Sequence, residues 1–161
     1  MPGKVMGPLF AFALAAAVPV SAQVEQVAVR TTGISCGSCA AVSEINLRRL
    51  VTGLDKVTIS MSKEAIVVSY KPGAPFRPQT IRDVLQPLQV GILQFQISAR
   101  GRVQEQGTKR IFVAGNDTFT LVEDPSGPKM PAATPIAIEA ILYDRVDPMQ
   151  LKVMTFKPIT Q

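Results

Sequence analysis

The apolar residues between Val24 and Leu93 change their spacing in an order that few folds accommodate. Alternation over residues 27–29 indicates a first strand. Steps of three and four residues over 40–54 then indicate a helix, with arginines near its end and Gly53 as a natural terminator. A strand followed directly by an amphipathic helix requires a layer of helix on sheet.

The second half of this stretch repeats the change of spacing. Alternation over residues 57–70, interrupted by a polar turn, predicts a hairpin of two strands. Pro78 suits the first turn of a second helix and Pro87 its end, and residues 92–103 predict a further strand. This order is the split βαβ arrangement. We therefore predict an α+β, ferredoxin-like βαββαβ domain over residues 23–96, with both helices on one face of an antiparallel sheet.

The same spacing predicts which side chains fill the core of this domain. They are Leu47, Leu50, Val57, Ile59, Val68, Ile81 and Leu85. Val42 and Ile45 fall off the main apolar stripe of the first helix. We expect these two residues to pack against the C-terminal part of the chain or against a partner.

Beyond about Arg100 the helical signal ends. Extended runs at residues 110–113, 119–122, 136–143 and 151–156 are separated by turns that contain glycine and proline. With the preceding strand they make about five short strands, which predict a small all-β domain, an OB-like barrel or a sandwich, over residues 97–161. Its first strand can continue the last strand of the preceding domain.

The first 22 residues form a unit of their own. A single positive charge at Lys4 precedes an almost wholly apolar run over residues 5–18, and small residues follow at Val20-Ser21-Ala22. This pattern predicts a signal peptide, residues 1–22, cleaved before Gln23; the alternative is an uncleaved membrane anchor. Cleavage implies a periplasmic or secreted protein without stable membrane insertion, in a compartment where disulfides form.

The charged residues exclude some classes of function. The chain carries 17 Lys and Arg against 12 Asp and Glu, a net charge of +5, but the basic residues are scattered. A scattered excess is typical of a solvated surface, so we predict no nucleic-acid site. The chain also has no histidine, and we identify no nucleophile beside a base and no acidic pair at a site. We therefore predict that it is not an enzyme.

Cys36 and Cys39 are the only cysteines, and they lie where the first predicted helix begins. Cys36 is expected in the preceding loop and Cys39 in the first turn. The free amide groups and the positive end of the helix dipole favour thiolate over thiol, and thiolate is the form that binds metal. Gly37 lets the backbone bend between the two ligands, and the hydroxyls of Ser35 and Ser38 are available beside the sulfurs.

The number of ligands indicates the kind of metal. Structural zinc sites take four ligands from Cys, His or carboxylate, and this chain offers two cysteines with no acidic residue nearer than Glu44. A thiolate pair suits one soft ion per monomer, Cu(I) first and then Hg(II) or Ag(I), with Zn(II) disfavoured. Such an ion stays open to another protein's thiolates, which suits transfer. Three thioethers, at Met130, Met149 and Met154, are further soft donors, although core packing is their more usual use.

The motif "GISCGSCA", followed by "LRRL", "LDKVTISMSKEAIVVSYKPG" and "IRDVL", resembles the heavy-metal-associated domain over about residues 24–93. That family includes copper chaperones, domains of copper-pumping ATPases and periplasmic mercury-binding proteins. The resemblance implies a ferredoxin-like fold and metal binding by Cys36 and Cys39. It also implies exchange of the ion with a membrane metal transporter or another thiolate metal carrier.

The chain departs from that family at three places near the motif. Ile34 stands where the family usually has Met, and Ser43 stands where a larger apolar residue is common. Gln89-Val90 replaces a glycine followed by an aromatic residue close to the metal loop. Groups around a metal site tune its affinity, so these changes bear on which metal is bound.

Two other functions fit the same cysteines. Cys-Gly-Ser-Cys resembles the dithiol of thioredoxin-like oxidoreductases, although this chain has no Trp and no aromatic residue between Phe12 and Tyr70. Alternatively, the domain is an interaction module whose cysteines form a structural disulfide after export. A bridge across so short a loop contributes little stability through loop entropy.

Overall fold

The computed structural model describes residues 21–160. The predicted signal peptide, residues 1–22, lies outside the described residues except for Ser21 and Ala22, so its cleavage stays a prediction. Within residues 21–160, no helix is long and apolar enough to cross a membrane.

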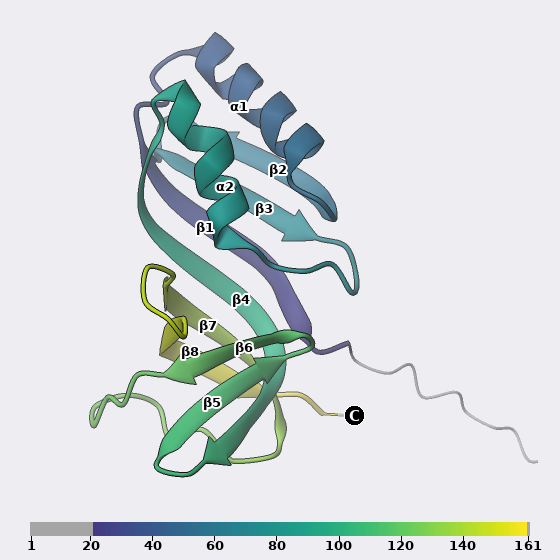
Figure 1. The fold of residues 1–161 in the computed structure, drawn as a ribbon, viewed down its shortest axis with the longest axis vertical. Helices are drawn as coiled ribbons and strands as arrows, with labels where there is room; N and C mark the ends of the chain where they lie inside the picture. The colour runs from purple at the N-terminus through teal and green to yellow at the C-terminus, as the bar shows by residue number, and fades with distance from the viewer. Residues whose placement is uncertain (1–20, 161) are drawn as a thin grey trace, which may run out of the picture.

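The first part of the chain is an α+β layer in the predicted order (Figure 1). Four strands form an antiparallel sheet in the order β2-β3-β1-β4, and both helices cover one face of it. The elements are β1 (Gln23–Thr32), α1 (Gly37–Leu50), β2 (Leu54–Ser60), β3 (Ala65–Tyr70), α2 (Pro78–Leu85) and β4 (Gly91–Gln106). This arrangement is the split βαβ fold that the sequence predicts.

The ends of α2 follow from two prolines. Pro78 occupies the first turn, where the missing amide hydrogen costs nothing because the first amides of a helix have no partner within it. At the other end, α2 stops at Leu85, and the chain continues as a short 3-10 helix over Gln86–Leu88 that contains Pro87. Gln89 then adopts a left-handed conformation with φ 59° and leads into β4.

The core lies between the helices and the sheet, and most of the predicted core residues belong to it. Leu47, Ile81 and Leu85 are fully buried. Leu50 is 52 % exposed, so its assignment to the core is wrong. The buried positions follow four-residue steps, Ser43, Leu47 and Val51, and Leu50 lies beside that stripe.

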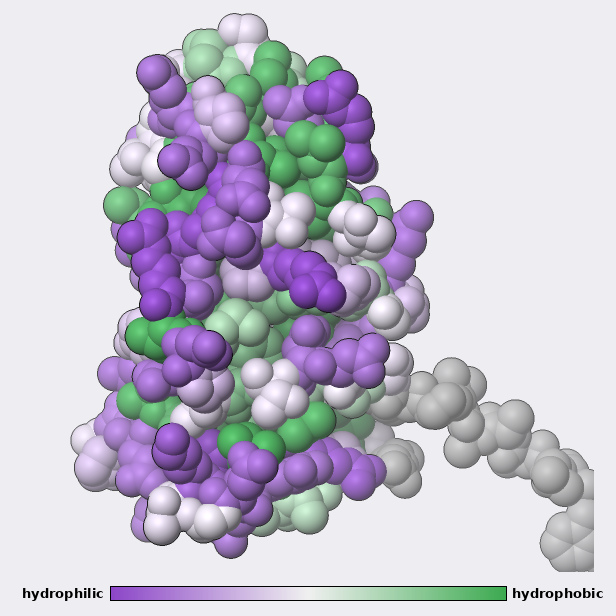
Figure 2. Space-filling view, viewed as in Figure 1, coloured by the Kyte–Doolittle hydropathy of each residue, from purple (hydrophilic) through white to green (hydrophobic). Residues whose placement is uncertain are grey.

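The outer side of α1 carries apolar residues that cover nothing within the molecule. Val42 is 44 % exposed and Ile45 is 61 % exposed, so their predicted packing against the C-terminal part of the chain is unsupported. Hydrophobic surface is visible over the helical layer in the upper part of the molecule (Figure 2). Contact of these residues with a partner stays a prediction.

The second part of the chain consists of strands. They are β5 (Lys109–Ala114), β6 (Asp117–Leu121), β7 (Pro135–Tyr143) and β8 (Gln150–Pro158). Together with β4 they pair in a closed ring, β4-β5-β6-β8-β7-β4, in which only β6 and β8 run parallel. The ring closes through a short contact, in which Thr120 and Leu121 of β6 pair with Gln150 and Leu151 of β8, so the five strands form a small barrel.

One strand belongs to both parts. β4 pairs with β1 through residues 91–100 and with β5 through residues 102–106. The boundary predicted between residues 96 and 97 therefore lies inside β4, as expected if the second part continues the last strand of the first. Independent folding of residues 23–96 and 97–161 stays a prediction.

Side chains also join the two parts. Phe76, in the segment before α2, lies 5.9 Å from the ring of Tyr70 and 6.5 Å from that of Phe119 on β6, measured between ring centroids. On another side, Arg82 of α2 pairs with Asp144, which follows β7. The buried residues of both parts form one hydrophobic cluster, so the cysteine motif is carried by a single body.

Candidate metal centre

The cysteine motif lies in the loop between β1 and α1, and the backbone fixes its path. Gly33 has φ +90°, and a Cβ built at this position would lie 2.7 Å from the carbonyl oxygen of Gln89. Only glycine combines this conformation with so close an approach. Ile34 is buried in the core beneath the loop, as an apolar residue at this position should be.

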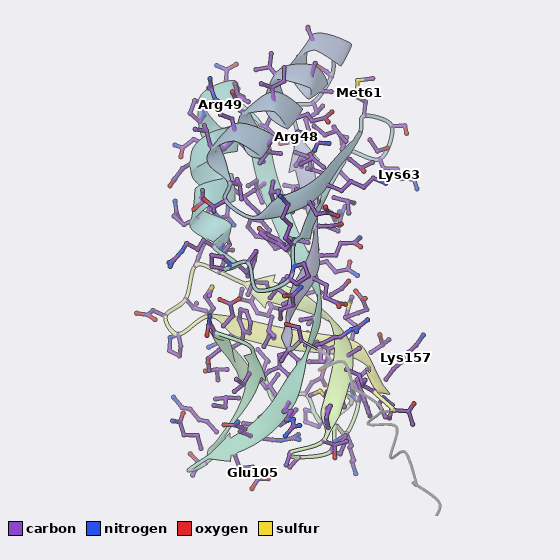
Figure 3. All side chains as sticks on the ribbon, turned by 90° about the vertical axis from the view of Figure 1, so that its right-hand side faces the viewer. Arg48, Arg49, Met61, Lys63, Glu105 and Lys157 are labelled. Atoms are coloured by element: carbon purple, nitrogen blue, oxygen red, sulfur yellow. A yellow bond between two sulfur atoms is a disulfide. The ribbon has the colours of Figure 1, made fainter. Side chains whose placement is uncertain are left out.

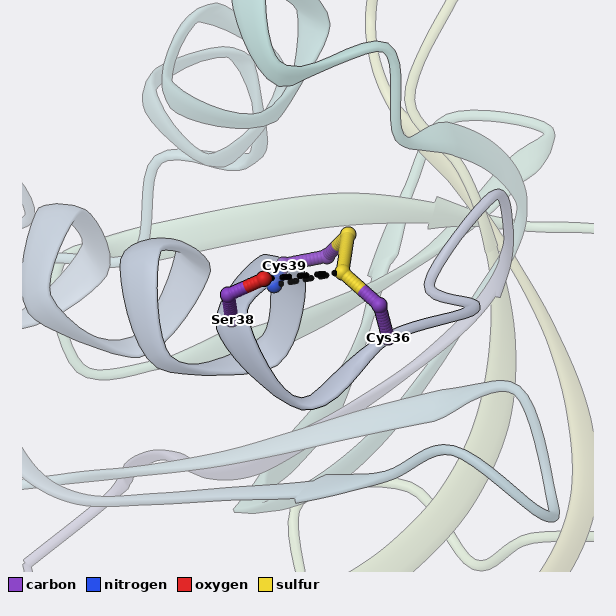
Figure 4. Close-up of a disulfide and its surroundings, with 3 residues drawn as sticks. All are labelled: Cys36, Ser38 and Cys39. Atoms are coloured by element: carbon purple, nitrogen blue, oxygen red, sulfur yellow. Dashed lines mark hydrogen bonds between the residues drawn. A yellow bond between two sulfur atoms is a disulfide. The ribbon is translucent and has the colours of Figure 1, made fainter.

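Cys36 is the N-cap residue of α1, and Cys39 lies in the first turn, as the sequence predicts. The Cys36 Sγ accepts a hydrogen bond from the Cys39 backbone N–H at 3.0 Å, and it lies 3.1 Å from the Ser38 Oγ (Figure 4). The Cys36 carbonyl accepts the first helical hydrogen bond, from the Ala40 amide. Sulfur thus takes the role that an oxygen of Ser, Thr or Asp usually has at an N-cap.

The two sulfurs are joined by a disulfide (Figure 4). The Cα atoms of Cys36 and Cys39 are 5.1 Å apart, and both side chains are partly exposed. The sequence leaves the oxidation state open. A disulfide has no thiolate to offer a metal, so the bond must be reduced before either sulfur acts as a ligand.

The ligands present fit a soft ion of low coordination number. Within residues 21–160, no group of three or more His, Cys, Asp or Glu side chains lies together in a way that could hold a metal. A four-ligand zinc site from one copy of the chain is therefore not built at the motif. Once reduced, Cys36 and Cys39 supply two adjacent sulfurs on a loop open to solvent, the arrangement that Cu(I), Ag(I) and Hg(II) accept.

The methionines lie in the other part of the chain. Met130 and Met149 are partly buried and pack against the hydrophobic cluster, which is the core use expected of them. Met154, on β8, is 39 % exposed. None of the three belongs to the loop or helix that carries the motif.

The fold brings Gln89-Val90, where the chain departs from the heavy-metal-associated family, close to the cysteine loop. Thr32, at the end of β1, pairs with Gly91, and the Gln89 carbonyl contacts Gly33, so Gln89-Val90 lies beside the cysteine loop. Val90 is buried, which places a small aliphatic side chain in the core at this position. Ser43 is also fully buried, and its hydroxyl has no hydrogen-bond partner.

The feature that sequence reasoning missed is the hydrogen bond from the Cys39 amide to the Cys36 sulfur. A cysteine is not a usual N-cap residue, so the motif alone does not indicate this role. The hydroxyl of Ser38 does lie beside the Cys36 sulfur, as the sequence predicts.

The sequence matches no family model and no curated protein. Solved structures that resemble part of this chain include three that each cover less than half of it. A CopZ metallochaperone is 18 % identical with a TM-score of 0.39, and the match covers 42 % of this chain and 98 % of that one. A copper-binding domain from HMA7, a P-type ATPase, is 21 % identical with a TM-score of 0.37, covering 43 % of this chain and 93 % of that one.

The third is the yeast copper transporter domain CCC2A, solved in apo and Cu(I)-loaded states. It is 22 % identical with a TM-score of 0.37, and the match covers 43 % of this chain and 94 % of that one. The three are a metallochaperone, a copper-binding domain and a copper transporter domain. The βαββαβ arrangement of this chain is established by its own strand pairing, and the metals named for those proteins are theirs.

Proposed function

We propose that this chain is an exported protein that captures or hands over a soft metal ion, Cu(I) first, through the reduced thiolates of Cys36 and Cys39. The observation that carries the proposal is the placement of both sulfurs at the start of α1. The ion is bound as cargo, one per monomer, and no catalytic step is assigned to the protein.

The environment of Cys36 supports a thiolate at this position. Its sulfur already accepts one backbone N–H and lies within reach of one hydroxyl, and both groups stabilise negative charge on sulfur after reduction. No carboxylate lies in the first turn of α1, so the helix dipole acts without an opposing charge. A thiolate pair held in this way binds a soft ion at neutral pH.

The exposure of the loop supports transfer of the ion. Cys36 and Cys39 are partly exposed, while the rest of the motif is held in place by buried Ile34. An ion bound by two sulfurs leaves room for an incoming thiolate. The partner is accordingly a membrane metal transporter or another thiolate metal carrier, and the location is the periplasm or the extracellular space.

We assign the strands β4 to β8 to a small all-β domain, an OB-like barrel. This domain is joined to the metal-binding unit through β4. Its role is to present the metal-binding unit to partners.

The test is a titration of fully reduced mature protein with Cu(I), Hg(II) and Zn(II) against competing chelators. We expect one soft ion per monomer and much weaker Zn(II) binding. Cys36→Ser and Cys39→Ser should each weaken Cu(I) binding severely, because a neutral hydroxyl replaces a thiolate at nearly equal size. The matched control is Met154→Leu, which removes an exposed soft donor far from the motif in sequence and should leave the affinity unchanged.

Two outcomes would overturn the proposal. If the reduced protein binds no soft metal, the motif serves another purpose. If the Cys36→Ser, Cys39→Ser double variant binds Cu(I) as tightly as the parent, the ion lies elsewhere, with Met130, Met149 and Met154 as the next donors to remove.

The disulfide itself favours a second candidate, a thiol-disulfide redox protein. A thiolate attacking the Cys39 sulfur would form a mixed disulfide there and release Cys36 as the thiolate, which the Cys39 amide and Ser38 then stabilise. The reduction potential separates the two functions. A redox protein exchanges readily with glutathione, whereas a metal carrier needs only to be kept reduced.

A further inference from the structure

One stretch of β4 has a strand on only one side. Residues 91–100 of β4 pair with β1, but on the opposite edge the pairing with β7 begins only at Phe95, opposite Leu142. β7 ends at Tyr143, and the chain then turns away at Asp144, which is held by Arg82 of α2. The edge of β4 over residues 91–94 therefore has no paired strand on the β7 side within residues 21–160.

Space is available beside this edge. Two hollows of about 540 and 530 Å³ flank the Arg82–Asp144 pair, and they share the lining residues Arg82, Ile92, Asp144 and Arg145. Their linings together include every residue of β4 from 91 to 95, and we call the two adjoining hollows the β4-edge groove. Four residues of strand span about 13 Å, the length of a short extended peptide.

Apolar side chains line one end of the β4-edge groove. Leu93 is 63 % exposed, and Tyr143 and Val146 are each 43 % exposed, so three of the eight exposed large apolar residues among residues 21–160 lie here. Leu93 also has no register partner in β1, because the pairing shifts between Arg30 and Thr31. A bulge of this kind re-aims a side chain, here toward the groove.

The charges in the groove favour an acidic occupant. Asp144 is neutralised by Arg82, and the remaining polar lining residues are uncharged except for Arg145, which makes no salt bridge within residues 21–160. The net charge of the lining is therefore positive. A second copy of the chain at this edge would bring the same positive charge, which disfavours self-pairing.

We propose that the β4-edge groove binds an extended, acidic segment of a partner protein, which adds to β4 as a strand along residues 91–94. Backbone hydrogen bonds to the open edge supply affinity, and alternate side chains supply specificity. Apolar side chains of the segment contact Leu93, Tyr143 and Val146, and a carboxylate pairs with Arg145. The groove continues the sheet beyond the end of β7, so the added strand lies in line with β7.

The test uses the mature full-length protein and two fluorescently labelled hexapeptides, one of alternating valine and glutamate and one of alternating valine and lysine, both capped at their ends. Fluorescence anisotropy at low salt should show saturable binding of the glutamate peptide, at least tenfold tighter than the lysine peptide. Arg145→Glu should weaken binding of the glutamate peptide at least tenfold. The matched control is Lys63→Glu, which makes the same charge change in the turn between β2 and β3 (Figure 3) and should weaken binding less than twofold.

Amide hydrogen exchange distinguishes strand addition from loose electrostatic contact. Binding of the glutamate peptide should slow exchange at residues 91–94, because an amide that faces water becomes hydrogen-bonded to the peptide. Three results would overturn the proposal. They are equal binding of the two peptides, equal effects of Arg145→Glu and Lys63→Glu, and protection that spares residues 91–94.

A stable dimer that already protects residues 91–94 without peptide would assign the groove to a second copy and would also overturn the proposal. Light scattering of the unliganded protein reports this outcome. The experiment involves no metal and a peptide without thiols. Its failure therefore leaves the proposed metal binding of Cys36 and Cys39 unaffected.

Discussion

The ion pair between Arg82 and Asp144 should be the most important polar contact between the helical layer and the β7–β8 connection. The guanidinium donates two hydrogen bonds to the carboxylate, from Nε at 2.5 Å and from the terminal nitrogen at 2.8 Å. The side chains are only 15 % and 7 % exposed. The guanidinium also lies 5.0 Å from the centroid of the Phe95 ring, and its hydrogen bond to Asp144 raises the pKa of Arg82 despite partial burial.

Asp144→Ala should destabilise the protein by about 3 kcal/mol, the lower end of the cost of removing one partner from a buried ion pair. The lower end applies because the neighbouring hollows give Arg82 a path to water once its partner is gone. With a urea m-value of about 2 kcal/mol/M, the midpoint of unfolding should fall by about 1.5 M. Urea unfolding followed by circular dichroism at neutral pH measures this shift.

The protein contains a matched control for this experiment. Glu44 and Arg48 form an ion pair on α1 with a similar Nε–carboxylate geometry at 2.9 Å, but their side chains are 41 % and 46 % exposed. Glu44→Ala should therefore cost less than about 0.5 kcal/mol. If Asp144→Ala costs no more than Glu44→Ala, burial does not determine the strength of the Arg82–Asp144 pair and the reasoning fails. The double variant Arg82→Met, Asp144→Val should recover much of the loss, because it leaves no buried charge.

Three further substitutions test other parts of the structure. Ser43→Ala should stabilise the protein by about 1 kcal/mol, since it removes a buried hydroxyl without a partner; an unchanged or lower urea midpoint would contradict this. Gly33→Ala should destabilise the protein by about 2 kcal/mol or more in the same assay, because the φ of Gly33 is +90° and the new Cβ would meet the Gln89 carbonyl. A fall in the urea midpoint of less than about 0.5 M, equivalent to about 1 kcal/mol, would contradict this. Burial, and then the charge of Asp117, raise the pKa of Tyr70, so its ionisation is disfavoured in the folded state. The free energy of unfolding should therefore fall as the pH rises above about 10, the pKa of an unfolded tyrosine. The Tyr70→Phe variant should lose less of this free energy between about pH 8 and 10.5, and equal losses in the two proteins would refute the assignment.

The candidate site shows how far a local motif determines geometry. The spacing of Cys36 and Cys39 and the start of the helical pattern were enough to predict one cysteine before α1 and the other in its first turn. These features depend on neighbouring residues, so the sequence carries them directly. The hydrogen bond between the Cys39 amide and the Cys36 sulfur depends on side-chain and backbone angles at the N-cap, and the sequence does not indicate them.

The surroundings of the motif required the fold. The contact of Gly33 with Gln89 joins residues more than fifty positions apart, and it exists because β1 and β4 are neighbours in the sheet. The same holds for the β4-edge groove, which is formed by α2, β4 and the connection after β7. The sequence predicts an extended run that ends at Tyr143, as β7 does, but no local pattern indicates that this strand pairs with β4 and leaves the adjacent edge of β4 open.

The sequence by itself determined the order and type of the secondary-structure elements, because alternation, helical spacing, proline and glycine act within a few residues. It placed Leu50 in the core wrongly, since a pattern of three- and four-residue steps fits both Leu50 and Val51 and only packing shows that Val51 is the buried one. Only the tertiary structure decided that β4 extends through both parts, that β4 to β8 close into a ring, and that Arg82 meets Asp144. Each of these depends on which strands pair across long stretches of chain, and strand pairing is settled by the packing of the whole molecule rather than by the residues of one segment.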